Sequence, residues 1–148
     1  MALYYDDLAI GTRFTSRELL VSLDDVLSFA RSFDPQPAHL DPEGAKATFF
    51  GEHVASGWHT CALTMRLIYE SVPLEGGIIG GGSDELRWPK PLRPGDTIHV
   101  ETEVAEMRKL KSRPGIGLVR IRTRTVTQRG DVVQTMVPNL FVPVRATG

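Results

Sequence analysis

The second half of the chain alternates hydrophobic and polar residues with the period of two that marks a half-buried β-strand. This alternation predicts long strands at residues 97–107, 118–128 and 132–142, and shorter ones at 12–20 and 84–88. The turn sequence Arg129-Gly130-Asp131 predicts a hairpin between the last two strands. Pro138 has no amide hydrogen to donate, so the last strand is expected to lie at a sheet edge or to contain a bulge.

The first half shows helical patterns instead. Ser22 followed by Asp24 and Asp25 is a helix start signal and predicts a helix over residues 23–32. Residues 57–72 are apolar nearly all round, which predicts a central buried helix. Glycines 76, 77, 80, 81 and 82 predict a flexible connection. Helices followed by long strands indicate an α+β fold, and the length suits a single domain over residues 1–148.

Composition narrows the classes of partner and compartment. The formal net charge is -1 and 24% of the residues are charged, so the sequence predicts no nucleic-acid partner and no membrane partner. A single cysteine, Cys61, cannot form an internal disulfide, which fits a reducing compartment. The start of the sequence lacks a secretory pattern and no apolar run reaches the length of a membrane span. We therefore expect a cytoplasmic protein.

The segment 33–41 carries the candidate chemistry. Pro35 and Pro37 fix their own φ angles and disfavour the helical region for Asp34 and Gln36, so a stiff extended turn is expected here. A carboxylate and an imidazole, Asp34 and His39, then share one rigid loop and can hold a water molecule or a substrate proton together. The alternative is that Asp34 only ends a helix and His39 only packs.

A second stretch, Ser56-Gly57-Trp58, opens the long apolar helix. The first turn of a helix has unpaired amide groups, which favour negative charge. The sequence therefore predicts that the Asp34 loop and this helix start form one site. His39, His53 and His59 lack the spacing of a zinc motif, so no metal is expected.

The D-x-x-P-x-H-L-D pattern of residues 34–41, the Ser56-Gly57 turn and the later Pro91–Asp96 element resemble the MaoC-like dehydratases. That family includes the (R)-specific enoyl-CoA hydratases and has the hot-dog fold, an antiparallel sheet wrapped around a central helix. The resemblance covers nearly the whole chain. Two positions depart from it: Gln36 stands where the family commonly has Asn, and Met65 stands where some hydratases have a serine.

The resemblance implies hydration or dehydration of a trans-2-enoyl thioester of coenzyme A or acyl carrier protein, with no cofactor beyond the substrate's own carrier. Asp34 and His39 would be the acid–base pair, and the Gly57 amide would stabilise the oxyanion. A homodimer or a higher homo-oligomer is also implied. The expected substrate-binding residues are Gln36, Ser56, Trp58, Phe50, Lys109 and Lys111.

Several of these assignments have alternatives. Phe50 and Trp58 can instead fill the core, and Lys109 and Lys111 can instead form a solvated hairpin tip. For the protein as a whole, the alternatives are a hot-dog acyl-CoA thioesterase and a non-catalytic subunit that binds acyl thioesters. The presence of both Asp34 and His39 argues against the second, because a pure binding protein needs no acid–base pair.

Overall fold

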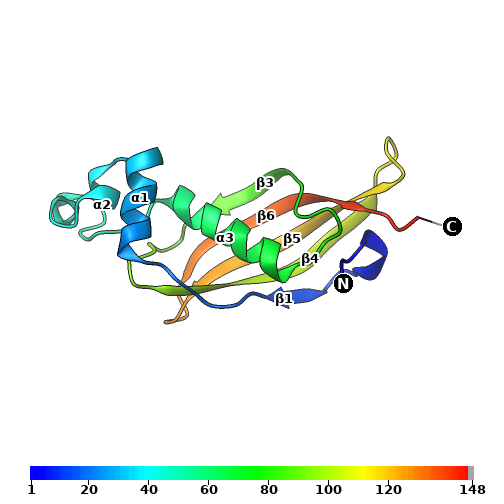
Figure 1. Ribbon diagram of the computed structural model, residues 1–148, viewed down its shortest axis with the longest axis horizontal. Coiled ribbons are helices and arrows are strands. Elements are labelled where there is room, and N and C mark those ends of the chain that lie inside the picture. The colour runs from blue at the N-terminus through cyan, green and yellow to red at the C-terminus, as the bar shows by residue number, and fades with distance from the viewer. Residues whose placement is uncertain (147–148) are drawn as a thin grey trace.

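In the computed structural model, which describes residues 1–146, the long helix α3 (Gly57–Ser71) lies across one face of an antiparallel sheet. Helices α1 (Leu23–Phe33) and α2 (Pro37–Leu40) sit together at one end of that sheet (Figure 1). The remaining elements are η1 (Tyr5–Asp7), β1 (Arg13–Thr15), β2 (Leu19–Leu20), η2 (Gly44–Ala47), β3 (Gly80–Arg87), β4 (Thr97–Lys109), β5 (Ile116–Thr127) and β6 (Val132–Pro143).

The sheet has the strand order β1-β4-β5-β6-β3, and β2 also pairs with β4. The predicted alternation places one row of side chains against α3 and the other row outward. This confirms the α+β class and the helix packed on one sheet face. The core contains Leu67 and Ile68 of α3 with Ile98, Val100, Val104, Val119, Ile121, Leu140 and Val142 of the strands.

Three sequence predictions need correction. Residues 12–20 form two short strands, because the Ser16 hydroxyl between them accepts the amide hydrogen of Val100 in place of a regular ladder bond (2.8 Å). Residues 80–82 begin β3 and are not a flexible connection. For Pro138 only the edge alternative is wrong, because β6 is an interior strand. The bulge alternative agrees with the structure, since Pro138 pairs with Ser83 of β3 next to a register irregularity between Gly80 and Ser83.

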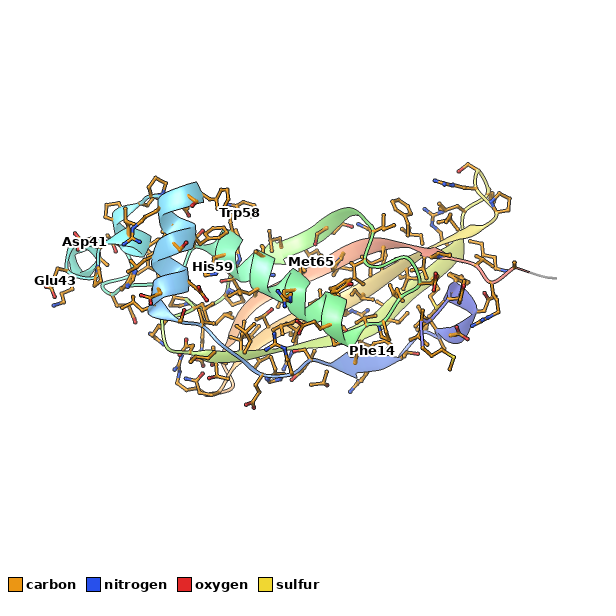
Figure 2. The ribbon with its side chains drawn as sticks, in the orientation of Figure 1. Phe14, Asp41, Glu43, Trp58, His59 and Met65 are labelled. Carbon is orange, nitrogen blue, oxygen red and sulfur yellow. The ribbon has the colours of Figure 1, made fainter. Side chains whose placement is uncertain are left out.

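Helix α3 is buried on one side only. Thr64 is fully buried and its hydroxyl lies 2.6 Å from that of Thr125 on β5. On the other side Trp58, Met65 and Tyr69 are exposed, at 59%, 38% and 61% of their surface. Figure 2 shows Trp58 and Met65 along this helix. The prediction of a fully buried helix is therefore wrong for a single chain, and an apolar stripe faces outward.

No helix in residues 1–146 is both long enough and apolar enough to cross a membrane.

The buried carboxylate of Asp96 holds the loop between β3 and β4 in place through hydrogen bonds. Asp96, 3% exposed, accepts hydrogen bonds from both terminal guanidinium nitrogens of Arg129 (2.8 and 3.2 Å), from Gln128 (3.1 Å) and from the Arg93 amide (2.9 Å). Burial raises the pKa of Asp96, but these hydrogen bonds outweigh burial and hold its pKa below the ordinary value. The carboxylate thus joins the β5–β6 turn to the loop that precedes β4.

We predict that Asp96→Ala lowers the free energy of unfolding by about 2 to 3 kcal/mol, because charge-assisted bonds are lost and the Arg93 amide loses its acceptor. Since the folded-state pKa is lowered, this stability is present above the unfolded pKa of about 3.9 and is lost as the pH falls through the folded value. Urea denaturation between pH 3 and pH 7 measures both effects. Glu43→Ala, which removes an exposed ion pair with Lys46, is the control. Equal effects of the two variants at pH 7 would contradict the structural role of Asp96.

Candidate active site

Asp34 is placed where α1 ends. Its amide donates to the Ala30 carbonyl (3.0 Å), and its φ and ψ of -151° and 69° leave the helical region. The backbone stays extended at Gln36, as the two prolines predict. Pro37 then starts the short helix α2, because proline is well suited to the first helical position. The expected extended turn over the whole of 33–41 is therefore wrong beyond Gln36, and His39 belongs to a helix.

His39 is oriented by its other ring nitrogen. Nδ1 lies 2.9 Å from the Val54 carbonyl, which can only accept, so Nδ1 carries the hydrogen. In the neutral imidazole Nε2 is then an acceptor. It lies 3.4 Å from Oδ2 of Asp34, and both side chains are about nine-tenths buried. Two acceptors thus face each other, and a group with hydrogens to donate can satisfy both.

The carboxylate of Asp34 has two further partners. Gln36 Nε2 donates to Oδ1 (2.5 Å) and the Ser56 hydroxyl donates to Oδ2 (2.7 Å). Burial raises the pKa of Asp34, but the two hydrogen bonds and the neighbouring His39 outweigh it, so the pKa lies below the ordinary value. Asp34 is therefore ionised at neutral pH.

Ser56 links Asp34 to the start of α3. It is the N-cap of that helix, is 1% exposed, and its Oγ accepts the Trp58 amide (3.2 Å) while donating to Asp34. Gly57 follows at the first helical position, where the amide has no acceptor within the helix. The carboxylate and this amide are thus held next to each other by one serine side chain.

These groups border a cavity of about 560 Å³. Phe50, predicted as substrate-binding, lies on its wall with its ring 6.4 Å from that of His39. Six of the predicted site residues therefore line one cavity, namely Asp34, Gln36, His39, Phe50, Gly57 and Trp58. A seventh, Ser56, is hydrogen-bonded to Asp34. Its lining comprises Asp34, Gln36, His39, Phe49, Phe50, Val54, Ala55, Gly57, Trp58, Thr60, Trp88, Pro89, Lys90, Pro91, Leu92 and Val133.

Lys109 and Lys111 are not near this cavity. They lie at the end of β4 and in the hairpin that follows it. That hairpin is at the opposite end of the sheet from α1 and α2 (Figure 1). Within one chain the structure does not bring these lysines to Asp34.

The sequence analysis did not identify Gln134 as a residue near the site, nor its contact with Trp88, which lines the cavity. Trp88 Nε1 donates to Oε1 of Gln134 (2.9 Å), and Gln134 is 1% exposed. A signal was present, because Gln134 is a polar residue on the inward row of β6 with Met136, Leu140 and Val142. Its partner is 46 residues away, which the local pattern does not reveal.

A second hollow, of about 590 Å³, lies over the charged side of the sheet. Two of its carboxylates are engaged in ion pairs, Glu103 with Arg13 (3.3 Å) and Glu101 with Arg124 (3.2 Å). It contains none of the predicted site residues. Among the described residues no group of three suitable side chains is arranged to hold a metal ion.

Comparison of the sequence with models of known protein families identifies the family of this chain. The family model of the MaoC like domain matches residues 7–127. The chain belongs to the MaoC-like domain family. The helix lying against an antiparallel sheet is the hot-dog fold expected from the motifs.

Individual relatives cover most of this MaoC-like domain. The crystal structure of a MaoC-like dehydratase from Rhodospirillum rubrum superposes with a TM-score of 0.94 at 48% identity, covering 99% of this chain and 100% of the other. An uncharacterized protein, YdeM of Bacillus subtilis, is 34% identical over 84% of this chain and 87% of its own length. The (R)-specific enoyl-CoA hydratase of Aeromonas caviae is 32% identical over 75% of this chain and 78% of its own.

We predict that Ser56→Ala raises the pKa of Asp34, because one of the hydrogen bonds that favour the ionised form is removed. A carboxyl ¹³C NMR titration measures this shift. The variant also loses an N-cap, at a cost of about 1 kcal/mol. Ser22→Ala, which removes the equivalent cap of α1, is the matched control: it should lose similar stability and leave the pKa of Asp34 unchanged. An unshifted Asp34 in Ser56→Ala would show that this hydrogen bond does not tune the carboxylate.

Proposed function

We propose that this protein adds water to a trans-2-enoyl thioester to give the (R)-3-hydroxyacyl thioester, and catalyses the reverse dehydration. The observation that carries the proposal is the pair of acceptors, Asp34 Oδ2 and His39 Nε2, 3.4 Å apart on the wall of a largely apolar cavity. Membership of the MaoC-like family and the named hydratase relative support the substrate class and the stereochemistry.

The proposed mechanism starts with a water molecule that donates one hydrogen to Asp34 and the other to His39. Its oxygen lone pair is then free to attack C3 of the enoyl group. One proton of the water passes to the pair, and a proton is delivered from the pair to C2. Because both groups lie on one face of the substrate, oxygen and hydrogen add to the same face.

The attack places negative charge on the thioester oxygen as the enolate forms. The Gly57 amide, at the start of α3, is proposed to donate to this oxygen, since the helix N-terminus favours developing negative charge. Asp34 is ionised and cannot fill this role. No metal or redox cofactor is needed in the proposed reaction. The acyl carrier is proposed to be coenzyme A or acyl carrier protein.

We also propose that the working unit is a homodimer formed through β3. This strand lies at the edge of the sheet, and the outward stripe of Trp58, Met65 and Tyr69 on α3 is apolar. Antiparallel pairing of β3 with its copy sets opposite ends of the two sheets side by side. The hairpin with Lys109 and Lys111 of the second copy then lies at the Asp34 end of the first, where it can meet the phosphates of the carrier.

The test is turnover of trans-2-enoyl-CoA, followed by loss of enoyl-thioester absorbance with a thiol reagent in parallel. We predict that Asp34→Asn and His39→Ala each lower kcat by about 10²- to 10⁴-fold, the usual contribution of a positioned acid–base group. Asp41→Asn is the control, because this motif carboxylate caps the next turn and does not line the cavity.

Two other results would overturn the proposal. Release of free thiol without prior hydration would assign a thioesterase. Binding of enoyl-CoA, detected as a thermal shift, without loss of absorbance would assign a non-catalytic binding subunit.

A further inference from the structure

Two contacts hold the end of α1 against the start of α3. One is the hydrogen bond from Ser56 to Asp34. The other is a ring pair: the imidazole of His59 on α3 stacks on the phenyl ring of Phe29 on α1, with ring centroids 4.7 Å apart and an angle of 5° between the ring planes. Figure 2 shows His59 near the start of α3, next to α1. On each helix the two contacts lie about one turn apart, so together they fix both the distance and the direction of α1 relative to α3.

The surroundings of His59 suit an uncharged ring. The residue is 6% exposed, and its buried Nδ1 has no hydrogen-bond partner among the described residues. A neutral imidazole can keep its hydrogen on Nε2 and leave only a lone pair at Nδ1, whereas an imidazolium carries a hydrogen on both nitrogens. Protonation would therefore place a buried donor at Nδ1 with no acceptor for it.

The neighbouring charges do not compensate for this burial. Asp25, one turn before Phe29 on α1, attracts a proton to His59, but burial outweighs that attraction and holds the pKa of His59 below its ordinary value. On α3 the next titratable or charged side chains are Cys61, whose thiol is bonded to β6, and Arg66, which is ion-paired within the helix. Every buried residue of β4 and β6, the strands that α3 contacts, is uncharged.

The lowered pKa links this ring to folding stability. Because the unfolded chain takes up the proton more readily than the folded chain, the stabilisation from a neutral His59 is complete above the unfolded pKa of about 6.5. It is lost as the pH falls from there towards the folded value. The loss acts at the ring pair with Phe29, about one turn from both Asp34 and Ser56.

We propose that His59 is a positioning residue of the site: its uncharged ring, stacked on Phe29, keeps Asp34 in contact with Ser56, and protonation of this ring in mildly acidic solution weakens that contact and lowers turnover. The kinetic part rests on the proposed function. The effect on Asp34 does not, because it concerns a hydrogen bond within the chain.

The first experiment compares the pH profile of kcat/KM for crotonyl-CoA hydration in the wild type, His59→Ala and His59→Phe. A phenyl ring can stack on Phe29 and takes up no proton, so His59→Phe should keep the rate at pH 7.5 that His59→Ala loses by about 10- to 100-fold through misplacement of Asp34. Between pH 7.5 and pH 5 the ratio of His59→Phe to wild type should rise by about three- to tenfold. His99→Gln, which removes a histidine paired with Glu101 on β4, is the control and should follow the wild-type profile.

The second experiment measures the pKa of Asp34 by carboxyl ¹³C NMR, without substrate. In His59→Ala this pKa should rise, in the same direction as in Ser56→Ala, because the Ser56 hydrogen bond is weakened. Val26→Ala is the matched control: it also removes buried side-chain atoms from the α1 region of the core but leaves the ring pair intact, so it should lower the melting temperature and leave Asp34 unchanged.

The outcomes separate this inference from the proposed function. If no enoyl-CoA is hydrated but the pKa of Asp34 rises in His59→Ala and not in Val26→Ala, the proposed function fails and the positioning role stands. If hydration is observed but His59→Phe keeps the wild-type pH profile, or if His59→Ala only lowers the melting temperature and leaves the Asp34 pKa unchanged, hydration stands and the positioning role is wrong.

Discussion

The hydrogen bond from the Ser56 hydroxyl to Asp34, 2.7 Å long, is the contact on which the site depends. It joins the end of α1, at Asp34, to the start of α3, at Ser56. These two points are far apart in the sequence. Because the same oxygen also caps α3, the ionised carboxylate and the free amide of Gly57 are fixed relative to each other. The capping of α3 by Ser56 therefore also sets the position of the Asp34 carboxylate relative to the Gly57 amide, which the proposed reaction requires.

The rest of the molecule keeps this junction in place from two directions. The Val54 carbonyl orients the His39 ring, and the Ala55 amide binds the Leu92 carbonyl of the β3–β4 loop (2.8 Å). That loop is in turn held by the buried Asp96 network. The contacts of His39 with Val54 and of Asp96 with Arg129 join residues 15 and 33 positions apart. The geometry of the site therefore depends on the tertiary fold.

Much of the fold follows from local pattern. The long strands are visible because one row of side chains is buried and the other is not, and α1 starts at Ser22 because its hydroxyl caps the helix, as predicted. The pairing of Asp34 with His39 was predicted from two prolines and a family motif. The part that failed depends on tertiary context: the end of the sheet at which Lys109 lies, and the exposure of one face of α3.

Gln134 is a single side chain whose hydrogen-bond partner also depends on tertiary context and could not be predicted from the sequence. A polar residue in an inward row signals a buried partner, but its partner Trp88 is chosen by how β6, α3 and the β3–β4 loop meet. Pro37 illustrates the opposite case, since one residue is compatible both with an extended turn and with the first position of a helix. The structure takes the second option and thereby places His39 on α2.

The central claim is that Asp34 and His39 act from one face of an enoyl thioester. The most direct measurement is the hydration of crotonyl-CoA in D₂O, followed by NMR of the isolated product. The account predicts 3-hydroxybutyryl-CoA of (R) configuration with a single deuterium at C2, on the same face as the new hydroxyl group. Deuterium on the opposite face, deuterium on both faces, or free coenzyme A with an intact double bond would contradict it.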